Sequence, residues 1–324
     1  MDLTQLDLPS LGPDLDRVET RLGDAVGSDD RLLGDVAGHL LSAGGKRLRP
    51  ALALTASYAA IGPDGAASAD VVTGAASVEL VHLGSLYHDD VIDEASTRRG
   101  VPSVNARWSN IVAILAGDFL LARASSLAAS LGADVAALLA DTIGELCRGQ
   151  VLELQHLFDV ERTEDAYSSA IEGKTASLMA TSCRVGGMVS GVSEPTLDAL
   201  TNFGRHLGLC FQIVDDVLDL TGETAKLGKR AGQDLLEGVY TLPVIYALRD
   251  SAELRDALGG PIEPERLESV RELVLARDVV ATSFGVARTH AAKASEALTG
   301  ADDLDPRVVQ ALRTLVDGLV SRDS

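Results

Sequence analysis

The hydrophobic pattern of this chain is helical over almost its whole length. Apolar residues recur at every third or fourth position, which places them on one face of a helix, while strand-like alternation is nearly absent. Breaks that contain glycine or proline separate several of these stretches. The pattern predicts an all-α fold with helices over residues 13–26, 30–43, 50–61, 68–93, 110–131, 133–158, 163–191, 195–221, 239–249, 264–277, 279–299 and 305–322.

The sequence indicates one domain. It contains no shift in composition that would mark a linker, no low-complexity tract and no short-period repeat. With 324 residues, 46% of them hydrophobic, the chain is long enough to bury a core and disorder is not the default. We predict a single large helical domain that spans residues 1–324.

Six aspartates form two groups with the same spacing. The first group ends a long apolar run, and the second lies inside another such run. In a helix, the first and last aspartates of each group are one turn apart on one face. We call these groups the first clamp (Asp89, Asp90 and Asp93) and the second clamp (Asp215, Asp216 and Asp219).

The two clamps predict a metal site. Unpaired carboxylates in apolar segments are energetically costly, and bound cations would remove that cost. Oxygen ligands without His or Cys are typical of magnesium, which is held by one or two carboxylates together with substrate phosphates. The alternative for either clamp alone is a chance cluster on a solvated helix face. The matched pair favours one magnesium site and a phosphorylated substrate.

Cations lie near the first clamp in the sequence. The pair Gly44-Gly45 lets the backbone approach an anion and precedes Lys46, Arg47 and Arg49, and arginine binds phosphate oxygens in a bidentate manner. The alternative is the end of a helix with solvated cations. A second cationic pair, Arg98-Arg99, directly follows the clamp. Together these groups predict a pocket for two phosphorylated groups, one bound through metal and one without metal.

Other polar residues have weaker signals. His82 lies seven positions before Asp89 and so shares its helix face, although a core histidine is the alternative. Lys174-Thr175 interrupts the helix predicted for residues 163–191, and Lys229 follows the second clamp in a glycine-rich stretch. Gln212 stands one turn before Asp216, where it could form a hydrogen bond near the metals.

Charge and cysteine content limit the partners and the compartment. The net charge of −20 argues against nucleic acid and against docking on anionic lipid. Residues 1–16 hold four aspartates and no basic residue, which disfavours a targeting signal, and the absence of a long uncharged apolar stretch predicts no transmembrane segment. We interpret Cys147, Cys183 and Cys210 as reduced core residues of a cytoplasmic protein.

Motifs along nearly the whole chain resemble those of the trans (head-to-tail) isoprenyl diphosphate synthases, also called polyprenyl synthetases. In family order they are Gly-Gly-Lys-Arg-Leu-Arg-Pro at 44–50, His82, the first clamp with Arg98-Arg99-Gly100, Gly117-Asp118, Lys174-Thr175, Phe211-Gln212 before the second clamp, Gly228-Lys229, Gly232-Gln233-Asp234-Leu235 and Thr241-Leu242-Pro243. Taken together, these motifs are highly specific.

The resemblance implies the isoprenoid synthase fold, with antiparallel helices around a central cavity, and a homodimer. It implies about three magnesium ions on an allylic prenyl diphosphate. The implied metal ligands are Asp89, Asp90, Asp93, Asp215 and Asp219, with Asp216 supporting the second clamp. The implied contacts to the allylic diphosphate or its metals are Arg98, Lys174, Thr175, Gln212 and Lys229, and those to isopentenyl diphosphate are Gly45, Lys46, Arg49, His82 and Arg99. The catalytic set is Asp89, Asp90, Asp93, Lys174, Asp215 and Asp216.

Product length depends on the space beside the first clamp. A prenyl chain growing from the clamp would pass Ser85 and Gly84, where short-product relatives tend to carry bulky aromatic residues. Glycine inside a helix costs about 0.5 to 1 kcal/mol relative to alanine, which suggests that space is needed there; packing of a neighbouring helix is the alternative. We predict a long-chain product, as for a quinone side chain.

Three other functions stay open beside this prediction. A farnesyl or geranylgeranyl diphosphate synthase would keep the chemistry and make a shorter product. A class I terpene cyclase is disfavoured by an aromatic content of only 3% and by the second aspartate clamp. A partner-dependent subunit of a heteromeric synthase is favoured only by Val239, where many relatives carry a lysine.

Overall fold

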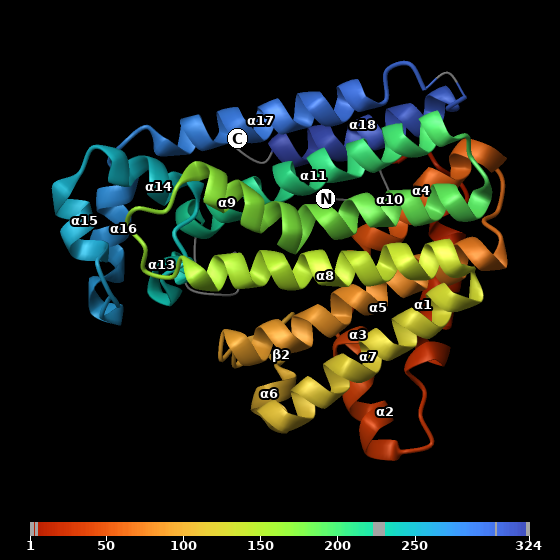
Figure 1. Ribbon diagram of the computed structural model, residues 1–324, viewed down its shortest axis with the longest axis horizontal. Coiled ribbons are helices and arrows are strands. Elements are labelled where there is room, and N and C mark those ends of the chain that lie inside the picture. The colour runs from red at the N-terminus through yellow and green to blue at the C-terminus, as the bar shows by residue number, and fades with distance from the viewer. Residues whose placement is uncertain (1–2, 4–5, 223–230, 302, 322–324) are drawn as a thin grey trace. The chain divides into compact units, whose positions relative to one another are not determined.

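The computed structural model describes residues 3, 6–222, 231–301 and 303–321. Nearly all regular structure in this part of the chain is helical, which confirms the predicted all-α fold (Figure 1). A hairpin of two short antiparallel strands, β1 (Thr97–Arg98) and β2 (Val101–Pro102), follows the first clamp. The helices are α1 (Leu11–Val26), α2 (Arg31–Ala37), α3 (His39–Ser42), α4 (Leu48–Ile61), α5 (Ala69–Ile92), α6 (Val104–Arg107), α7 (Asn110–Ser130), α8 (Ala133–Gln155), α9 (Glu164–Ile171), the π-helix η2 (Glu172–Ala176), α10 (Ser177–Ser190), α11 (Glu194–Thr221), α13 (Gln233–Glu237), α14 (Leu242–Arg249), α15 (Ala252–Leu258), the 3-10 helix η3 (Pro264–Arg266), α16 (Leu267–Leu275), α17 (Val279–Ala297) and α18 (Pro306–Val320).

The helices group into two compact units. Unit 1 comprises residues 1–143, 178–204 and 297–315, and unit 2 comprises residues 144–177, 205–296 and 316–324. The single domain predicted from the sequence stays a prediction. The first clamp belongs to unit 1 and the second clamp to unit 2.

Helix α5 is the core helix of unit 1. Its N-cap is Ser68, whose hydroxyl accepts a hydrogen bond from the Val71 amide at 3.2 Å, and the helix packs against α1, α4 and α7. Glycines allow close approach in this unit. A Cβ atom at Gly186 would lie 1.9 Å from the carbonyl oxygen of Ala53, so no larger residue fits there without movement. The first clamp therefore stands at the end of a tightly packed helix.

The part of unit 2 that follows the second clamp has its own apolar core. Helices α14, α15 and α16 pack against one another, and the Tyr240 hydroxyl donates a hydrogen bond to the Leu258 carbonyl. Helix α14 begins at Leu242 rather than at residue 239, because Thr241 is its N-cap and Pro243 stands in the first turn, a favoured position for proline. The buried core includes Leu220, Leu235, Tyr240, Val244, Leu248, Leu254, Leu258, Val270 and Val274.

The predicted interruption at Lys174-Thr175 is confirmed as the π-helix η2. Its widened turn lies between α9 and α10 and packs closely on α8, because a Cβ atom at Gly149 would lie 2.3 Å from the Lys174 amide nitrogen. Other differences from the predicted elements concern short segments. The helix predicted for residues 30–43 is divided into α2 and α3, and the short helices α6, α13 and α15 were not predicted.

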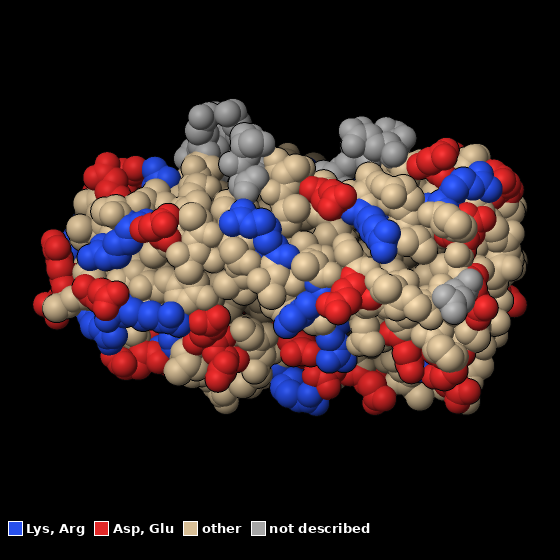
Figure 2. Space-filling model, turned by 90° about the horizontal axis from the view of Figure 1, so that it is seen from above, with Lys and Arg blue, Asp and Glu red and all other residues tan. Residues whose placement is uncertain are grey.

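The surface and the cysteines refine two further expectations. Acidic and basic side chains are interspersed over the described residues of the face in Figure 2.

Cys183 and Cys210 are buried as predicted, but the core assignment of Cys147 is wrong, because this residue is exposed on α8. Among the described helices, α7 alone is long and apolar enough to cross a membrane by length and composition; this is weak evidence, since core helices of soluble proteins meet the same criterion.

Candidate active site

The three aspartates of the first clamp, at the end of α5, have different environments. Asp90 is fully buried and its Oδ1 accepts a hydrogen bond from Arg98 Nε of β1 at 2.6 Å, whereas Asp90 Oδ2 is buried without a hydrogen-bond partner. Burial raises the pKa of Asp90 above its ordinary value, although Arg98 opposes this shift. Asp89 is half-buried and Asp93 is exposed. The accessible carboxylates of this clamp are thus Asp89 and Asp93, and Asp90 anchors the hairpin.

A cluster of cations, Arg47, Arg49 and Arg99, lies with His82 beside this clamp in unit 1. Arg47 is buried, and Arg49 and Arg99 are half-buried. Arg49 Nε is buried without a hydrogen-bond partner. Burial lowers the pKa of Arg49 to about 10, with a smaller contribution from Arg99, while Glu79 and Asp89 oppose the shift. Burial and the same arginines lower the pKa of His82 well below its ordinary value, so its imidazole is neutral near pH 7. Charged donors of this kind form short, strong hydrogen bonds with phosphate oxygens, so the cluster could bind an anion.

The remaining predicted contacts to isopentenyl diphosphate lie in or near the same cluster. Gly45 and Lys46 are exposed in the turn that precedes α4. Arg99 Nη1 donates hydrogen bonds to the carbonyl oxygens of Leu40, at 3.2 Å, and Gly44. The structure therefore brings together the residues of the glycine motif and Arg99, whereas Arg98 pairs with Asp90.

The second clamp, in unit 2, is organised by hydrogen bonds from its own helix α11 and from the neighbouring α9 and η2. Asp216 is buried and accepts hydrogen bonds from the Tyr167 hydroxyl at 2.6 Å and from Gln212 Nε2 at 2.7 Å. Gln212 Oε1 in turn accepts from the Thr175 hydroxyl at 2.7 Å. Burial raises the pKa of Asp216 to about 7, and the two donors oppose this shift. Asp215, in contrast, is exposed.

Asp219 supports the segment that follows the second clamp in the described structure. It is buried, its backbone carbonyl accepts from the Gly232 amide at 2.9 Å, and its Oδ2 accepts from the Asp234 amide at 3.4 Å. These contacts connect the clamp to the Gly-Gln-Asp motif. The predicted contact Lys229 lies outside the described residues.

The sequence did not indicate three residues near the second clamp, namely Glu153, Tyr167 and Arg162. Glu153 Oε1 accepts a hydrogen bond from Lys174 Nζ at 2.6 Å, and the Tyr167 hydroxyl donates to Asp216 of the clamp. Arg162 is buried, and its Nη1 donates to the Tyr240 carbonyl at 3.0 Å, while its Nε and Nη2 have no hydrogen-bond partner. Tyr167 stands eight residues before Thr175, a spacing that a regular α-helix would not align, so its position gave no signal in the sequence. Glu153 and Arg162 gave no signal either, because their contacts cross from one helix or loop to another.

The residues predicted to set product length have different surroundings. A Cβ atom at Gly84 would lie 3.1 Å from the Gly117 carbonyl oxygen and 3.2 Å from the Leu121 side chain, both on α7. These contacts favour the alternative that Gly84 is needed for close packing of α5 on α7, and a role for Gly84 in product length stays a prediction. Ser85 is half-buried and its hydroxyl donates to the His82 carbonyl at 2.9 Å. A role for Ser85 in chain length stays a prediction.

The donor set fits magnesium. In unit 1, the carboxylates of Asp89 and Asp93 provide oxygen ligands, and Asp90 Oδ2 of the same clamp is buried without a hydrogen-bond partner. In unit 2, the exposed carboxylate of Asp215 likewise offers oxygen ligands. Within the described residues, no group of three or more His, Cys, Asp or Glu side chains is placed to hold a metal ion by itself. Magnesium does not need such a group, since one or two carboxylates and the phosphates of a substrate complete its coordination.

Comparison with known proteins identifies the class. The polyprenyl synthetase family model matches residues 30–275, so the chain belongs to the polyprenyl synthetase family. The resemblance inferred from the motifs is thereby confirmed.

Individual relatives cover almost the whole chain. It is 42% identical over 313 residues to a nonaprenyl diphosphate synthase of Mycobacterium tuberculosis, covering 94% of this chain and 91% of the relative. It is 40% identical over 293 residues to component 2 of a heptaprenyl diphosphate synthase of Geobacillus stearothermophilus, covering 90% of each. A solved polyprenyl synthase of Caulobacter crescentus, complexed with calcium and isoprenyl diphosphate, matches with a TM-score of 0.89 and 33% identity over 97% of this chain and 96% of that one.

Proposed function

We propose that this protein condenses isopentenyl diphosphate head-to-tail with an allylic prenyl diphosphate and releases a linear, all-trans, long-chain polyprenyl diphosphate. One observation carries the proposal within unit 1. The Asp90–Arg98 ion pair, at 2.6 Å, holds the hairpin in place, and the residue after Arg98, Arg99, lies in the cation cluster. A carboxylate site suited to metal and a cation site suited to a metal-free anion are therefore held by one short segment.

The cation cluster would bind the diphosphate of isopentenyl diphosphate. Lys46, Arg49 and Arg99 offer charged donors, and the neutral His82 can donate one hydrogen bond without adding charge. Because Arg49 Nε is buried and unpartnered, an accepting phosphate oxygen would satisfy a donor that otherwise costs stability. This arrangement orients the isopentenyl double bond relative to the metal-bound substrate.

The allylic diphosphate would be held by Asp89, Asp90, Asp93, Asp215 and Asp219 through divalent metal, and by Arg98, Lys174, Thr175, Gln212 and Lys229. Magnesium, when bound, supplies neutralisation of the charge that develops on the departing diphosphate. Arg98 and Lys174 would stabilise the same charge as the allylic carbon–oxygen bond breaks. The double bond of isopentenyl diphosphate then attacks the allylic carbon, and the released diphosphate accepts the proton that is lost, so no protein nucleophile is needed.

An exposed apolar face in unit 1 supports a proposal for the assembly. Ile111 is 71% exposed and Leu115 is 59% exposed, with Ile114 beside them on the same side of α7. Exposed apolar residues at this spacing favour a helix that packs against a partner. We propose a homodimer in the cytoplasm with this face at the contact between subunits.

The reaction and the product length are tested in one experiment. The purified protein is incubated with magnesium, labelled isopentenyl diphosphate and each allylic primer in turn, and the products are separated by chain length. Long linear products are expected. A short product would keep the reaction and overturn the chain length, a cyclic hydrocarbon would indicate a terpene cyclase, and turnover only after addition of a second protein would indicate a subunit of a heteromeric synthase.

A further inference from the structure

Arg47 has a different environment from the other cations of the glycine motif. It is buried, and its φ of 48° lies in the left-handed region that side chains other than glycine rarely adopt. The preceding Gly44 and Gly45 have φ values of 80° and 155°. We call residues 44–47 the glycine turn. Its conformation needs support, because a strained non-glycine residue persists only where its surroundings hold it in place.

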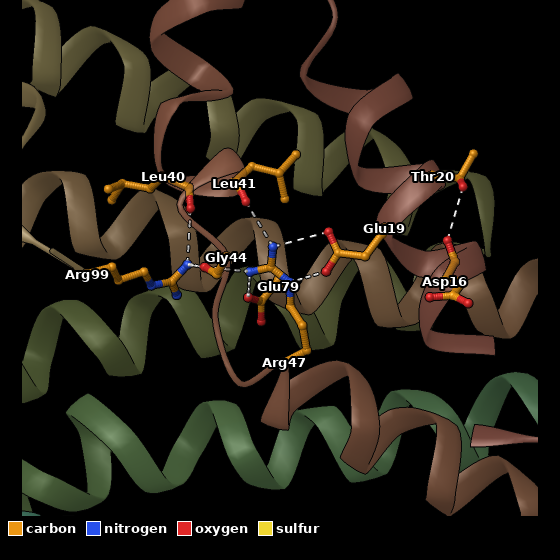
Figure 3. A network of polar contacts seen from close by, with 9 residues as sticks. All are labelled: Asp16, Glu19, Thr20, Leu40, Leu41, Gly44, Arg47, Glu79 and Arg99. Atoms are coloured by element: carbon orange, nitrogen blue, oxygen red, sulfur yellow. Dashed lines mark hydrogen bonds and ion pairs between the residues drawn. The ribbon is translucent and has the colours of Figure 1, made fainter. Parts of the chain in front are cut away.

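The guanidinium of Arg47 supplies that support by folding back over the turn (Figure 3). Nη1 donates to Glu79 Oε1 at 3.0 Å and to the Gly44 carbonyl at 3.4 Å, and Nη2 donates to Glu19 Oε2 at 3.2 Å and to the Leu41 carbonyl at 3.2 Å. Nε donates to Glu19 Oε1. An arginine has five N–H donors, and all five of Arg47 are engaged within the protein. No donor is left for a phosphate oxygen.

Arg47 and Arg99 also enclose the backbone of Gly45. A Cβ atom at this position would lie 2.9 Å from Arg99 Nη1 and 3.0 Å from Arg47 Nη1. The two guanidinium groups and the turn thus form one packed assembly, in which Gly44 accepts hydrogen bonds from both arginines. The exposed Lys46 and the incompletely bonded Arg49 flank Arg47 in the sequence.

Glu79 lies at the centre of this assembly. It is 1% exposed, stands one turn before His82 on α5, and pairs with Arg47. Its electrostatic interactions also reach Arg49 and Arg99. A buried carboxylate repels an anion, so on charge alone Glu79 should weaken the binding of a diphosphate. Its place among cations that would bind an anion is explained if it orders those cations.

We infer that Arg47 is a positioning residue for isopentenyl diphosphate: its ion pairs with Glu19 and Glu79 hold the glycine turn so that Lys46 and Arg49 are presented to the diphosphate, which Arg47 itself does not contact. This inference rests on the proposed function, since it assigns a role within the same binding site. It separates the three cations of the motif into one that orders the turn and two that bind.

The inference is tested by whether removing a negative charge strengthens or weakens the binding of isopentenyl diphosphate. Glu79→Gln and Glu19→Gln each remove a negative charge beside the cation cluster. If charge alone mattered, both variants would bind isopentenyl diphosphate more tightly. If the ion pairs position the turn, both bind it more weakly. We expect about a tenfold loss for the buried Glu79, as for a hydrogen bond to a charged group, and about a threefold loss for Glu19, because solvent screens a partly exposed ion pair. The side chain of Glu19 is 42% exposed, so its variant should fold.

Substitutions of Arg47 give a second measurement. Arg47→Lys keeps the charge but can replace only part of the five hydrogen bonds, so the KM for isopentenyl diphosphate should rise about tenfold while the KM for the allylic diphosphate changes less than about twofold. In a double-mutant cycle, Arg47→Lys and Glu79→Gln together should raise this KM much less than the product of the single effects, because both disrupt one ion pair.

A matched control separates positioning from stability. Asp14 is 2% exposed and, like Glu79, accepts hydrogen bonds from other segments of unit 1: from the Tyr58 hydroxyl at 2.9 Å and from the Ala67 amide at 2.8 Å. Asp14→Asn should lower the melting temperature as Glu79→Gln does, yet leave both KM values unchanged at 25 °C. Equal losses of isopentenyl diphosphate binding in the two variants would overturn the inference.

Binding is measured by calorimetry and turnover by product analysis with the full-length protein. If the unsubstituted protein neither binds nor condenses isopentenyl diphosphate, the proposed function fails and the inference fails with it. If the unsubstituted protein is active but Glu79→Gln and Glu19→Gln bind as tightly as it does or more tightly, the inference alone fails.

Discussion

Replacing Gly84 with alanine adds one methyl group at the contact between α5 and α7. That group would lie 3.1 Å from the Gly117 carbonyl oxygen and 3.2 Å from the Leu121 side chain. The leucine side chain can move, but the carbonyl belongs to the backbone of a packed helix. We therefore expect Gly84→Ala to push α5 and α7 apart slightly and to lower the stability of unit 1.

The magnitude follows from two opposing contributions. Adding a methyl group to a filled contact costs about 1 to 3 kcal/mol, whereas alanine is favoured over glycine inside a helix by about 0.5 to 1 kcal/mol. The net expectation is a loss of about 0.5 to 2 kcal/mol. Gly23 is a matched control in the same unit, because it lies in helix α1 and no atom lies within 4 Å of its Cβ position. Gly23→Ala should gain about 0.5 to 1 kcal/mol.

Urea unfolding of both variants, followed by circular dichroism, measures the difference. Product chromatography on Gly84→Ala, at a temperature where it is folded, should give the chain length of the unsubstituted protein. An equal gain in stability for both variants would show that Gly84 is not a packing contact. A shorter product from a fully stable Gly84→Ala would restore the idea that this glycine leaves space for the prenyl chain.

Three further predictions concern other parts of the molecule. Tyr167→Phe removes a donor from the buried Asp216 and should cost about 1 to 3 kcal/mol in thermal unfolding, while no loss would mean that Asp216 does not depend on this bond. Burial lowers the pKa of His290 to about 4, so the unfolded chain takes up a proton first as the pH falls below about 6.5. The full shift corresponds to a loss of about 2 kcal/mol in the free energy of unfolding between pH 7 and pH 5, and we expect about half of this, because the side chain is only half-buried. His290→Gln should remove this part of the pH dependence in melting curves, and an unchanged curve would contradict it. Chelation of divalent metal should abolish condensation but preserve the binding of isopentenyl diphosphate measured by calorimetry, because its proposed site in unit 1 consists of cations. Loss of that binding would indicate that metal also takes part in binding isopentenyl diphosphate.

The sequence predicted the elements and the motif residues better than it predicted their individual roles. Asp89 and Asp93 follow from local spacing, and the break at Lys174 follows from a polar pair in an apolar run. In contrast, Arg47 and Arg49 look equivalent in the sequence. They differ because Arg47 turns back to Glu19 and Glu79, which are 28 and 32 residues away.

Gly84 and Cys147 show the same limit in apolar runs. A glycine in a helix indicates either open space or a close neighbour, and only the position of α7 decides between them for Gly84. Hydrophobic periodicity placed Cys147 in a helix correctly but not its side, since α8 is apolar around much of its circumference. The short helices α6, α13 and α15 have too few residues for their periodicity to be recognised.

The π-helix η2 orients the side chains that hold the second clamp in place. Tyr167 and Thr175 both serve Asp216, one directly and one through Gln212, although they are eight residues apart. In an uninterrupted α-helix, such a pair would point about 80° apart. The widened turn absorbs one residue, so the pair is oriented like residues seven apart, only about 20° from alignment. Deleting one residue from Glu172–Ala176 would restore a regular helix and rotate Tyr167 away from its carboxylate. The hydrogen bonds to Asp216 therefore depend on the rotation of α9 relative to the residues that follow it, which the one extra residue in the π-helical turn determines.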